Sequence, residues 1–200
     1  MKLHLGAFDQ ILPGWINTDV TPHLWIARAP GAARLACLLG LISRERLAQH
    51  ERGIFAKLRR LDVRRRFPYP DDSVTAVYSS HMLEHIPRSA AAFCLKECHR
   101  VLKPGGVIRI AVPDLDQWIR EYDPAQPDIF VTRAFEPSER RSKNQHHYLY
   151  NEISLGRLLQ ECGFAHARRV QPGQGDCPDA AIIDCRPESL IMEASKPGAS

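Results

Sequence analysis

Apolar residues occur along the chain in short runs that predict β-strands. Alternating or continuous apolar positions bounded by turn residues are typical of strands. The predicted strands are Leu3–Phe8, Trp15–Val20, Val74–Ser79, Val107–Val112 and Leu190–Ala194, with a weaker candidate at Ala165–Val170.

Two other segments show the spacing of amphipathic helices. Between Pro87 and Lys103, apolar residues recur every three or four positions, and the sequence Pro104-Gly105-Gly106 ends the pattern. A second helix is predicted from Glu152 to Cys162, preceded by a residue suited to cap it and followed by a glycine. Strands that alternate with helices predict an α/β domain with a mostly parallel sheet.

Two stretches read as insertions into a single domain that spans residues 1–200. Residues 23–57 carry helical material, and residues 123–145 are polar and rich in proline and charge, which is typical of a lid-like loop. Within the first stretch, Leu35, Leu38, Leu39 and Ile42 have helical spacing. They could form a flap over the core, a dimer surface or a shallow membrane contact, and we favour the core or flap.

The composition is that of an ordinary globular protein. The chain has 200 residues, 44% of them hydrophobic and 25% charged, and its formal net charge is only +4. The charge alone does not favour nucleic acid as a partner. We find no secretory leader pattern, and the longest apolar stretch falls short of the roughly 20 residues of a membrane span, so we expect a cytoplasmic protein.

No metal site is predicted from the cysteines or histidines. The six cysteines form no C-x-x-C pair and are expected to be structural thiols. The string from His81 to His85 matches the H-x-x-E-H motif of inverted zinc peptidases, which needs both histidines on one continuous helix. A strand that runs to Ser79 and a proline at position 87 argue against such a helix.

Three carboxylates fall where strands of a parallel sheet are expected to end, which is where such sheets bind ligands. They are Asp19, Asp62 and Asp114. An acid after the second strand can accept hydrogen bonds from ribose hydroxyls. The alternative is that each aspartate only caps a turn, which aspartate commonly does.

An ordered set of motifs resembles the class I S-adenosylmethionine-dependent methyltransferases, in particular those that modify small molecules and glycans. The stretches that carry the resemblance are Leu5-Gly6, Pro13–Asp19, Phe67–Ser73, Val77–His85, Arg100–Gly106 and Glu188–Leu190. It implies a Rossmann-like fold with a mostly parallel twisted sheet, helices on both faces and an antiparallel C-terminal strand. It also implies S-adenosylmethionine as cofactor and methyl transfer to a small-molecule or glycan-precursor acceptor.

The resemblance also assigns residues to the cofactor site. Those implied to bind S-adenosylmethionine are Gly6, Asp19, Asp62, Val63, Ser80 and His81. It does not assign a catalytic group, and the candidates are His81 and His147, because a histidine can take a proton near neutral pH.

The first loop departs from the family pattern. Only Gly6 and Gly14 remain of its usual glycines, and too few residues separate the first two strands for a helix. Strand alternation would put Phe8 on the face of His4 and Gly6, and we favour a pocket that stays open. The alternative function is a catalytically eroded relative that acts as a binding or partner subunit.

The residues from Arg59 to Arg66 form a basic cluster that has several possible roles. It could be a solvated face, a site for an anionic small substrate or, least favoured, a contact to nucleic acid. We also expect that the chain could form a homodimer.

Overall fold

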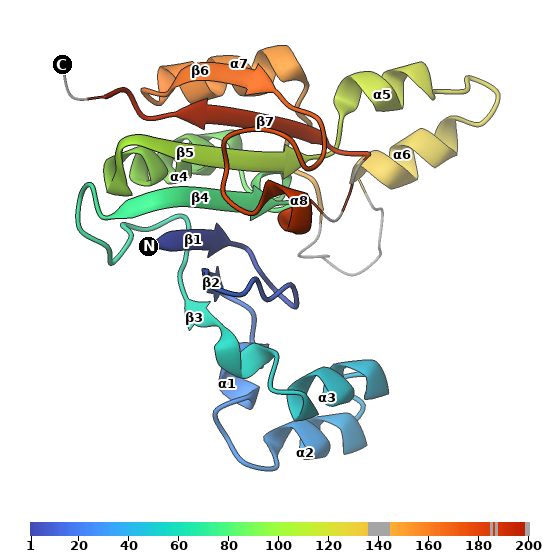
Figure 1. Ribbon diagram of the computed structural model, residues 1–200. Coiled ribbons are helices and arrows are strands. Elements are labelled where there is room, and N and C mark those ends of the chain that lie inside the picture. The colour runs from blue at the N-terminus through green and yellow to red at the C-terminus, as the bar shows by residue number, and fades with distance from the viewer. Residues whose placement is uncertain (136–144, 185, 187, 199–200) are drawn as a thin grey trace.

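The computed structural model describes residues 1–135, 145–184, 186 and 188–198. Seven strands form one sheet in the order β3-β2-β1-β4-β5-β7-β6 (Figure 1). The strands are β1 (Lys2–Leu5), β2 (Ile16–Asp19), β3 (Arg59–Arg60), β4 (Val74–Ser80), β5 (Leu102–Val112), β6 (Ala165–Arg169) and β7 (Leu190–Ser195). The α-helices are α1 (His23–Ile26), α2 (Ala32–Leu38), α3 (Arg44–Glu51), α4 (Arg88–Val101), α5 (Leu115–Arg120), α6 (Pro127–Phe135), α7 (Glu152–Glu161) and α8 (Ala180–Ile183). Two single-turn 3₁₀ helices are η1 (Phe55–Lys57) and η2 (Leu83–His85).

The sheet has the predicted mixture of strand directions. Strands β1 to β5 pair in parallel, whereas β7 is antiparallel to both β5 and β6. This arrangement confirms the Rossmann-like fold class. The strand order reverses between β1 and β4, and such a switch point at the carboxyl ends of the strands is where open α/β sheets bind ligands.

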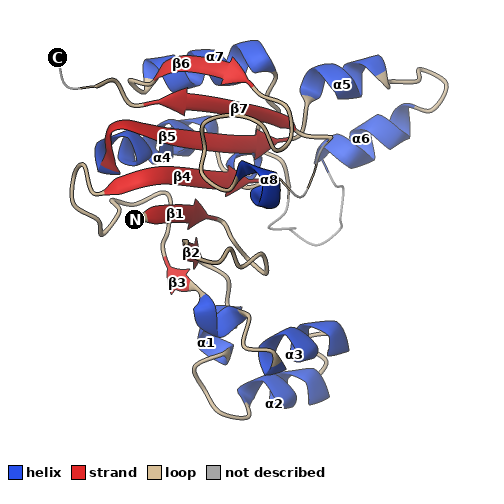
Figure 2. Ribbon diagram, viewed as in Figure 1, coloured by secondary structure: helices blue, strands red, loops and turns tan. Residues whose placement is uncertain are grey.

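The two predicted amphipathic helices form as α4 and α7, and their apolar sides cover one face of the sheet (Figure 2). The capping residue of α7 is Asn151, whose side chain accepts a hydrogen bond from the backbone N–H of Ser154. Apolar side chains from α4, α7 and the sheet form the main core. The helix patterns therefore identified both the elements and their buried sides.

The first strand is shorter than predicted. It ends at Leu5, because Gly6 has a φ of 66° and turns the chain away from the sheet. Phe8 has a φ of 43°, so the alternation that placed it on the face of His4 does not reach it, and that placement was wrong. Residues 6–15 join the parallel strands β1 and β2 without a helix, as the short spacing predicted.

The other face of the sheet is covered mainly by a loop that follows β6. Residues 171–184, which end in α8, lie over the face that carries Trp15, Ala76 and Tyr78 (Figure 1). The indole N–H of Trp15 donates to Asp179 Oδ2 over 2.9 Å, and the Tyr78 hydroxyl donates to the Ile183 carbonyl over 2.7 Å. This segment takes the place that a first crossover helix would occupy.

An ion-pair network lies buried under the same segment. The guanidinium of Arg109, on β5, is fully buried and pairs with the carboxylates of Asp184 and Glu193. Its Nε donates to Asp184 Oδ1 over 2.9 Å, and Nη1 donates to the Gln174 carbonyl over 2.8 Å. A buried charge requires this degree of pairing.

The helical segment 23–57 does not cover the core with its leucines. Helices α1 to α3 and η1 lie beyond the β3 edge of the sheet (Figure 1). Leu35, Leu38 and Leu39 are 57%, 85% and 64% exposed, so their interpretation as core or flap residues was wrong. Leu24 and Phe55 are buried there instead. Among the described residues, no helix is both long and apolar enough to cross a bilayer.

The segment 123–145 is not a loop throughout. Residues 127–135 form α6, because their apolar positions Ile129, Phe130 and Ala134 follow helical spacing that the prolines and charges obscured. The expectation of a loop therefore needs correction over this range. Residues 136–144 of the expected lid lie outside the described part of the chain.

Five cysteines are free thiols within the described residues. Cys94, Cys98, Cys162 and Cys177 are buried and Cys37 is half-buried. Burial raises the pKa of the Cys177 thiol to about 12, which keeps it protonated and unreactive. These residues therefore fit the predicted structural role.

Candidate cofactor and acceptor site at the carboxyl edge of the sheet

Strand register brings the predicted site residues to one edge of the sheet. Leu5 lies opposite Thr18 on one side and Ser79 on the other, so the residues that follow each of them leave the sheet at the same level. The backbone N–H of Leu61 donates to the Asp19 carbonyl over 3.1 Å, which places Asp62 at this edge too. The edge therefore carries Gly6, Asp19, Asp62, Val63, Ser80 and His81.

Asp19, at the end of β2, holds two backbone groups. Its Oδ2 accepts from the N–H of Phe8 over 3.0 Å, and its Oδ1 accepts from the N–H of Thr21 over 2.7 Å. The turn-forming role is thus real. A carboxylate has about four lone-pair sites, and this one is half-buried, so it can still accept hydrogen bonds from a ligand.

Asp62 is engaged with its own neighbours. Its two oxygens accept from Nε and Nη2 of Arg64, each over 2.9 Å, and Arg65 lies 3.7 Å away. The hydrogen bond from Arg64 lowers the pKa of the carboxyl group, which stays ionised. Val63 next to it packs against the main core.

Gly6 has a packing reason to be a glycine. A Cβ on this residue would lie 2.6 Å from Cγ of Met82, which reaches over from the loop after β4. The positive φ of Gly6 also favours glycine. Met82 therefore fills the space beside the residue that the resemblance assigns to close cofactor approach.

Phe8 points toward the helical segment. Its ring centroid lies 5.9 Å from that of Phe55 and 6.0 Å from that of His23, and the guanidinium of Arg46 lies 4.6 Å from it. Arg46 also pairs with Asp9 over 2.7 Å. The first loop is thus held by α3, and Phe8 is part of that contact.

His81 lies between two polar side chains just after β4. Its Nε2 is 2.8 Å from Ser189 Oγ, and its Nδ1 is 3.2 Å from Glu84 Oε1. A carboxylate beside Nδ1 favours a proton on that nitrogen and leaves Nε2 as an acceptor. The arrangement resembles the oriented histidine of many general bases.

The peptidase interpretation of the same string does not fit. The backbone of His81 is left-handed, with a φ of 49°, and only the single turn η2 follows before Pro87. A zinc peptidase needs both histidines on a continuous helix, which the described residues do not form here.

His147 lies beside the same loop. Its backbone N–H donates to the Glu84 carbonyl over 2.7 Å, whereas its side chain is exposed. Both candidate bases thus contact Glu84, His81 through the carboxylate and His147 through the backbone carbonyl.

Asp114 has a structural capping role, which was the alternative to ligand binding for each of the three aspartates. It caps α5, because its Oδ1 accepts from the N–H groups of Asp116 and Gln117 over 3.0 and 3.3 Å. Its Oδ2 pairs with Arg169 over 2.9 Å. It is almost fully buried and plays a structural part.

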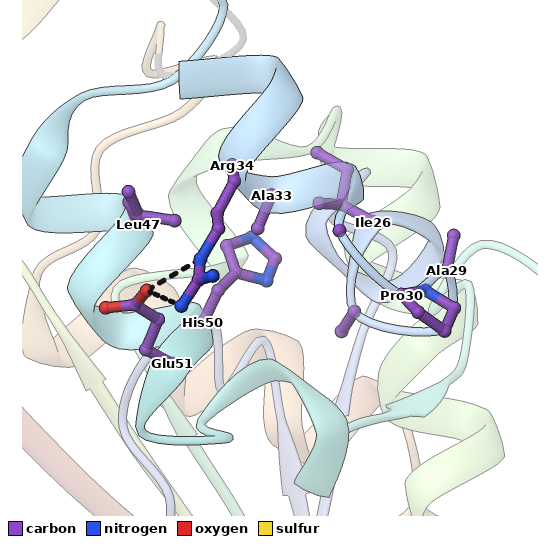
Figure 3. Close-up of a pocket in the computed structure, with 10 residues that line it drawn as sticks. Ile26, Ala29, Pro30, Ala33, Arg34, Leu47, His50 and Glu51 are labelled. Carbon is purple, nitrogen blue, oxygen red and sulfur yellow. Dashed lines mark hydrogen bonds and ion pairs between the residues drawn. The ribbon is translucent and has the colours of Figure 1, made fainter. Parts of the chain in front are cut away.

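A pocket of about 250 Å³ opens within the helical segment (Figure 3). Arg34 and Glu51 form an ion pair across part of it, and His50 lines it. The Nε2 of His50 lies 2.9 Å from Nδ1 of His23, and burial, followed by the charge of His50, lowers the pKa of His23. This pocket is joined to the first loop through the rings of His23, Phe55 and Phe8.

Sequence reasoning missed Met82, Glu84 and Ser189 as parts of the site. The H-x-x-E-H string contains the first two, but its residues were weighed as a zinc motif and as part of the resemblance, not for contacts with Gly6 or His81. Ser189 is 108 positions from His81, and nothing local in the sequence links them.

Comparison with known proteins supports methyl transfer as the general class of activity. Residues 39–110 match the sequence profile of a family described as a methyltransferase domain. A search of curated protein sequences found no match. Within residues 39–110 the family match agrees with the resemblance drawn from the motifs, which implies S-adenosylmethionine as methyl donor.

Solved structures share the fold at low identity. A protein described as an S-adenosylmethionine-dependent methyltransferase from Methanosarcina mazei is 16% identical, with a TM-score of 0.54 over 99% of this chain and 92% of its own. One from Thermotoga maritima, described as a possible histamine N-methyltransferase, is 17% identical, with a TM-score of 0.52 over 98% and 81%. A possible exported protein from Bordetella parapertussis is 14% identical, with a TM-score of 0.54, and this chain spans 62% of its length.

Proposed function

We propose that this protein transfers a methyl group from S-adenosylmethionine to a small-molecule or glycan-precursor acceptor. The observation that carries the proposal is the strand register that gathers Gly6, Asp19 and Ser80 at the switch-point edge. Methyl transfer relies mostly on alignment of acceptor and methyl group, so a site of few polar groups on rigid strands is sufficient.

The residues at this edge fit the cofactor with one side-chain movement. Asp19 would accept hydrogen bonds from the ribose, and Asp62 and Val63 would border the adenine. Met82 must swing away from Gly6 to admit the methionine end, which its three rotatable bonds allow. When bound, the cofactor supplies an electrophilic methyl group on a positively charged sulfur.

His81 is the residue that we assign as base when the acceptor needs deprotonation. Glu84 Oε1 lies 3.2 Å from Nδ1, and its charge favours a proton on that nitrogen. Nε2 then faces Ser189 Oγ, through which a proton can pass. His147 is exposed and has no comparable orienting partner among the interactions described.

An anionic acceptor is favoured by the basic cluster next to the edge. Arg64 and Arg65 are paired with Asp62, whereas Arg59, Arg60 and Arg66 are exposed. Arg60 lies opposite Asp19 in the β2–β3 register, so its charge stands beside the proposed cofactor site. Guanidinium groups bind phosphate and carboxylate well.

Calorimetric titration with S-adenosylmethionine and S-adenosylhomocysteine tests the proposal. We expect micromolar binding by the wild type and a loss of about 1–3 kcal/mol in Asp19→Ala, because ribose hydroxyls lose their acceptor. Asp72→Ala, at the opposite end of β4, is the matched control and should bind normally. With an acceptor identified, His81→Gln should lower turnover about 10²-fold or more.

The second candidate is a non-catalytic binding or partner subunit. The contact between Met82 and Gly6 favours it, because that side chain fills part of the proposed site. In that case the wild type would not bind the cofactor, whereas Met82→Ala would. Failure of both proteins to bind while they remain folded would refute the cofactor site itself.

A further inference from the structure

Glu84 is a buried carboxylate, and among the residues 1–135, 145–184, 186 and 188–198 its oxygens have no hydrogen-bond partner. Its side chain is fully buried, and neither oxygen accepts a hydrogen bond of good geometry from the residues that the structure describes. Two histidine nitrogens lie within 4 Å of its Oε1, Nδ1 of His81 at 3.2 Å and Nε2 of His85 at 3.8 Å. An isolated buried carboxylate is costly and normally binds a cation or a metal.

A third histidine completes a cluster around this carboxylate. One ligand atom each from Glu84, His85 and His146 lies within 4.8 Å of the other two. The rings of His85 and His146 have centroids 4.9 Å apart and an interplanar angle of 32°. The cluster joins η2 to the segment that follows the undescribed residues 136–144.

The backbone orients both rings as metal ligands are commonly oriented. The Nδ1 of His146 is 2.9 Å from the Ala134 carbonyl, and the Nδ1 of His85 is 3.4 Å from the Gln145 carbonyl. A carbonyl can only accept, so each Nδ1 carries the proton and each Nε2 presents a lone pair. Ligating histidines usually donate their other N–H to a carbonyl or carboxylate in this way.

We propose that Glu84, His85 and His146 bind a divalent transition-metal ion of the Zn²⁺ class. Two imidazoles and one carboxylate are a donor set that suits zinc and its neighbours rather than calcium or magnesium. The sequence predicted no metal here, because the H-x-x-E-H motif requires two histidines on one helix. The fold instead supplies the second histidine from a segment 61 positions after His85, as the numbering shows.

Only small movements are needed to close the site. Zinc ligands at 2.0–2.1 Å in a tetrahedron lie on the order of 3.4 Å apart, against the 4.8 Å limit here. Rotation of the two half-buried histidine rings can supply the difference. Three protein ligands leave a fourth position for water or for an oxygen of the acceptor.

The ion would fasten the α6 segment to the loop that carries the proposed base. His146 is tied to the last turn of α6 through Ala134, and Glu84 is three residues from His81. Metal binding would therefore hold α6 close to the loop that carries His81. This inference rests on the cluster alone and holds whether or not the protein binds S-adenosylmethionine.

The test is metal binding by the chelator-treated full-length protein, measured by calorimetry with Zn²⁺ and by the visible spectrum of added Co²⁺. We expect one equivalent per chain and a tetrahedral or five-coordinate Co²⁺ spectrum. His146→Ala should weaken Zn²⁺ binding at least 100-fold. Glu84→Gln should do the same, and because it changes a buried residue, circular dichroism must confirm its fold.

His50→Ala is the matched control, because His23 and His50 form the other close histidine pair among the described residues. It should bind Zn²⁺ like the wild type. The proposal is overturned if the folded wild type takes up no Zn²⁺ at micromolar concentration. It is equally overturned if His50→Ala abolishes binding while His146→Ala retains it.

Discussion

Single residues at the proposed site have structural roles in addition to any role in ligand binding. Asp19 holds the N–H groups of Phe8 and Thr21, and Gly6 gives room to Met82. Either residue would therefore be favoured at its position even without a cofactor. Substitutions here must be compared by binding and by stability together, because a loss of fold would imitate a loss of affinity.

His4 provides a pH prediction at this scale. Burial, opposed by its hydrogen bond to Asn17, lowers the pKa of His4 to about 4, from an ordinary value of 6.5. The unfolded chain then binds a proton on this residue at a higher pH than the folded protein does. Stability is therefore complete above pH 6.5 and falls as the pH drops toward 4.

By pH 5 the loss from His4 should reach about 2 kcal/mol. Urea unfolding at pH 7 and pH 5 measures it. The variant His4→Gln, which can still pair with Asn17, should lose much less stability between these two pH values than the wild type. Equal losses in both proteins would mean that His4 is not the titrating group.

Helices were predictable from the sequence where an apolar pattern continued for several turns and only one side of the helix is buried. The helices α4 and α7 each bury one stripe, and their spacing shows it. Strand β3 has only two residues, both exposed arginines, so no periodicity could reveal it. The leucines of α2 have helical spacing, but the spacing cannot say whether anything covers them. Of the site, the strand ends were predictable, whereas the contacts made by Met82 and Ser189 depend on tertiary packing.

The difference between α7 and α2 yields a stability prediction. Leu158 on α7 is 1% exposed and belongs to the main core, whereas Leu38 on α2 is 85% exposed. Leu158→Ala should lower the free energy of unfolding by about 2–5 kcal/mol, because it removes contacts and leaves a cavity. Leu38→Ala should change it by no more than about 0.5 kcal/mol. Chemical denaturation of both variants measures the difference, and a large loss in Leu38→Ala would show that α2 is covered in solution.

At the scale of the whole molecule, one face of the sheet is covered by residues that come late in the chain. The segment 171–184 covers Trp15 and Tyr78, and Asp184 in it pairs with the buried guanidinium of Arg109. The salt bridge of Lys2 with Asp179 joins the first strand to the same segment. The two ends of the described chain thus form one core.

Asp184→Ala tests this dependence. Among the described residues it leaves the buried Arg109 guanidinium with Glu193 as its one ionic partner, and breaking a buried pair in this way costs about 3–5 kcal/mol. The control is Asp176→Ala in the same segment, whose pair with Arg168 is exposed and worth at most about 1 kcal/mol. Thermal unfolding should separate the two variants clearly, and equal melting temperatures would contradict the prediction.

The covering segment also sets the order of events during synthesis. A ribosome adds about 5–20 residues per second. Asp179, 177 positions after Lys2 of β1, is therefore synthesised on the order of 10–40 s later. Until then the face of the sheet with Trp15 and Tyr78 lacks the segment that covers it. The contacts of these two residues with that segment join positions that are far apart in the sequence. Contacts of this separation slow folding, so the nascent chain should be a strong client for chaperones that hold exposed apolar surface.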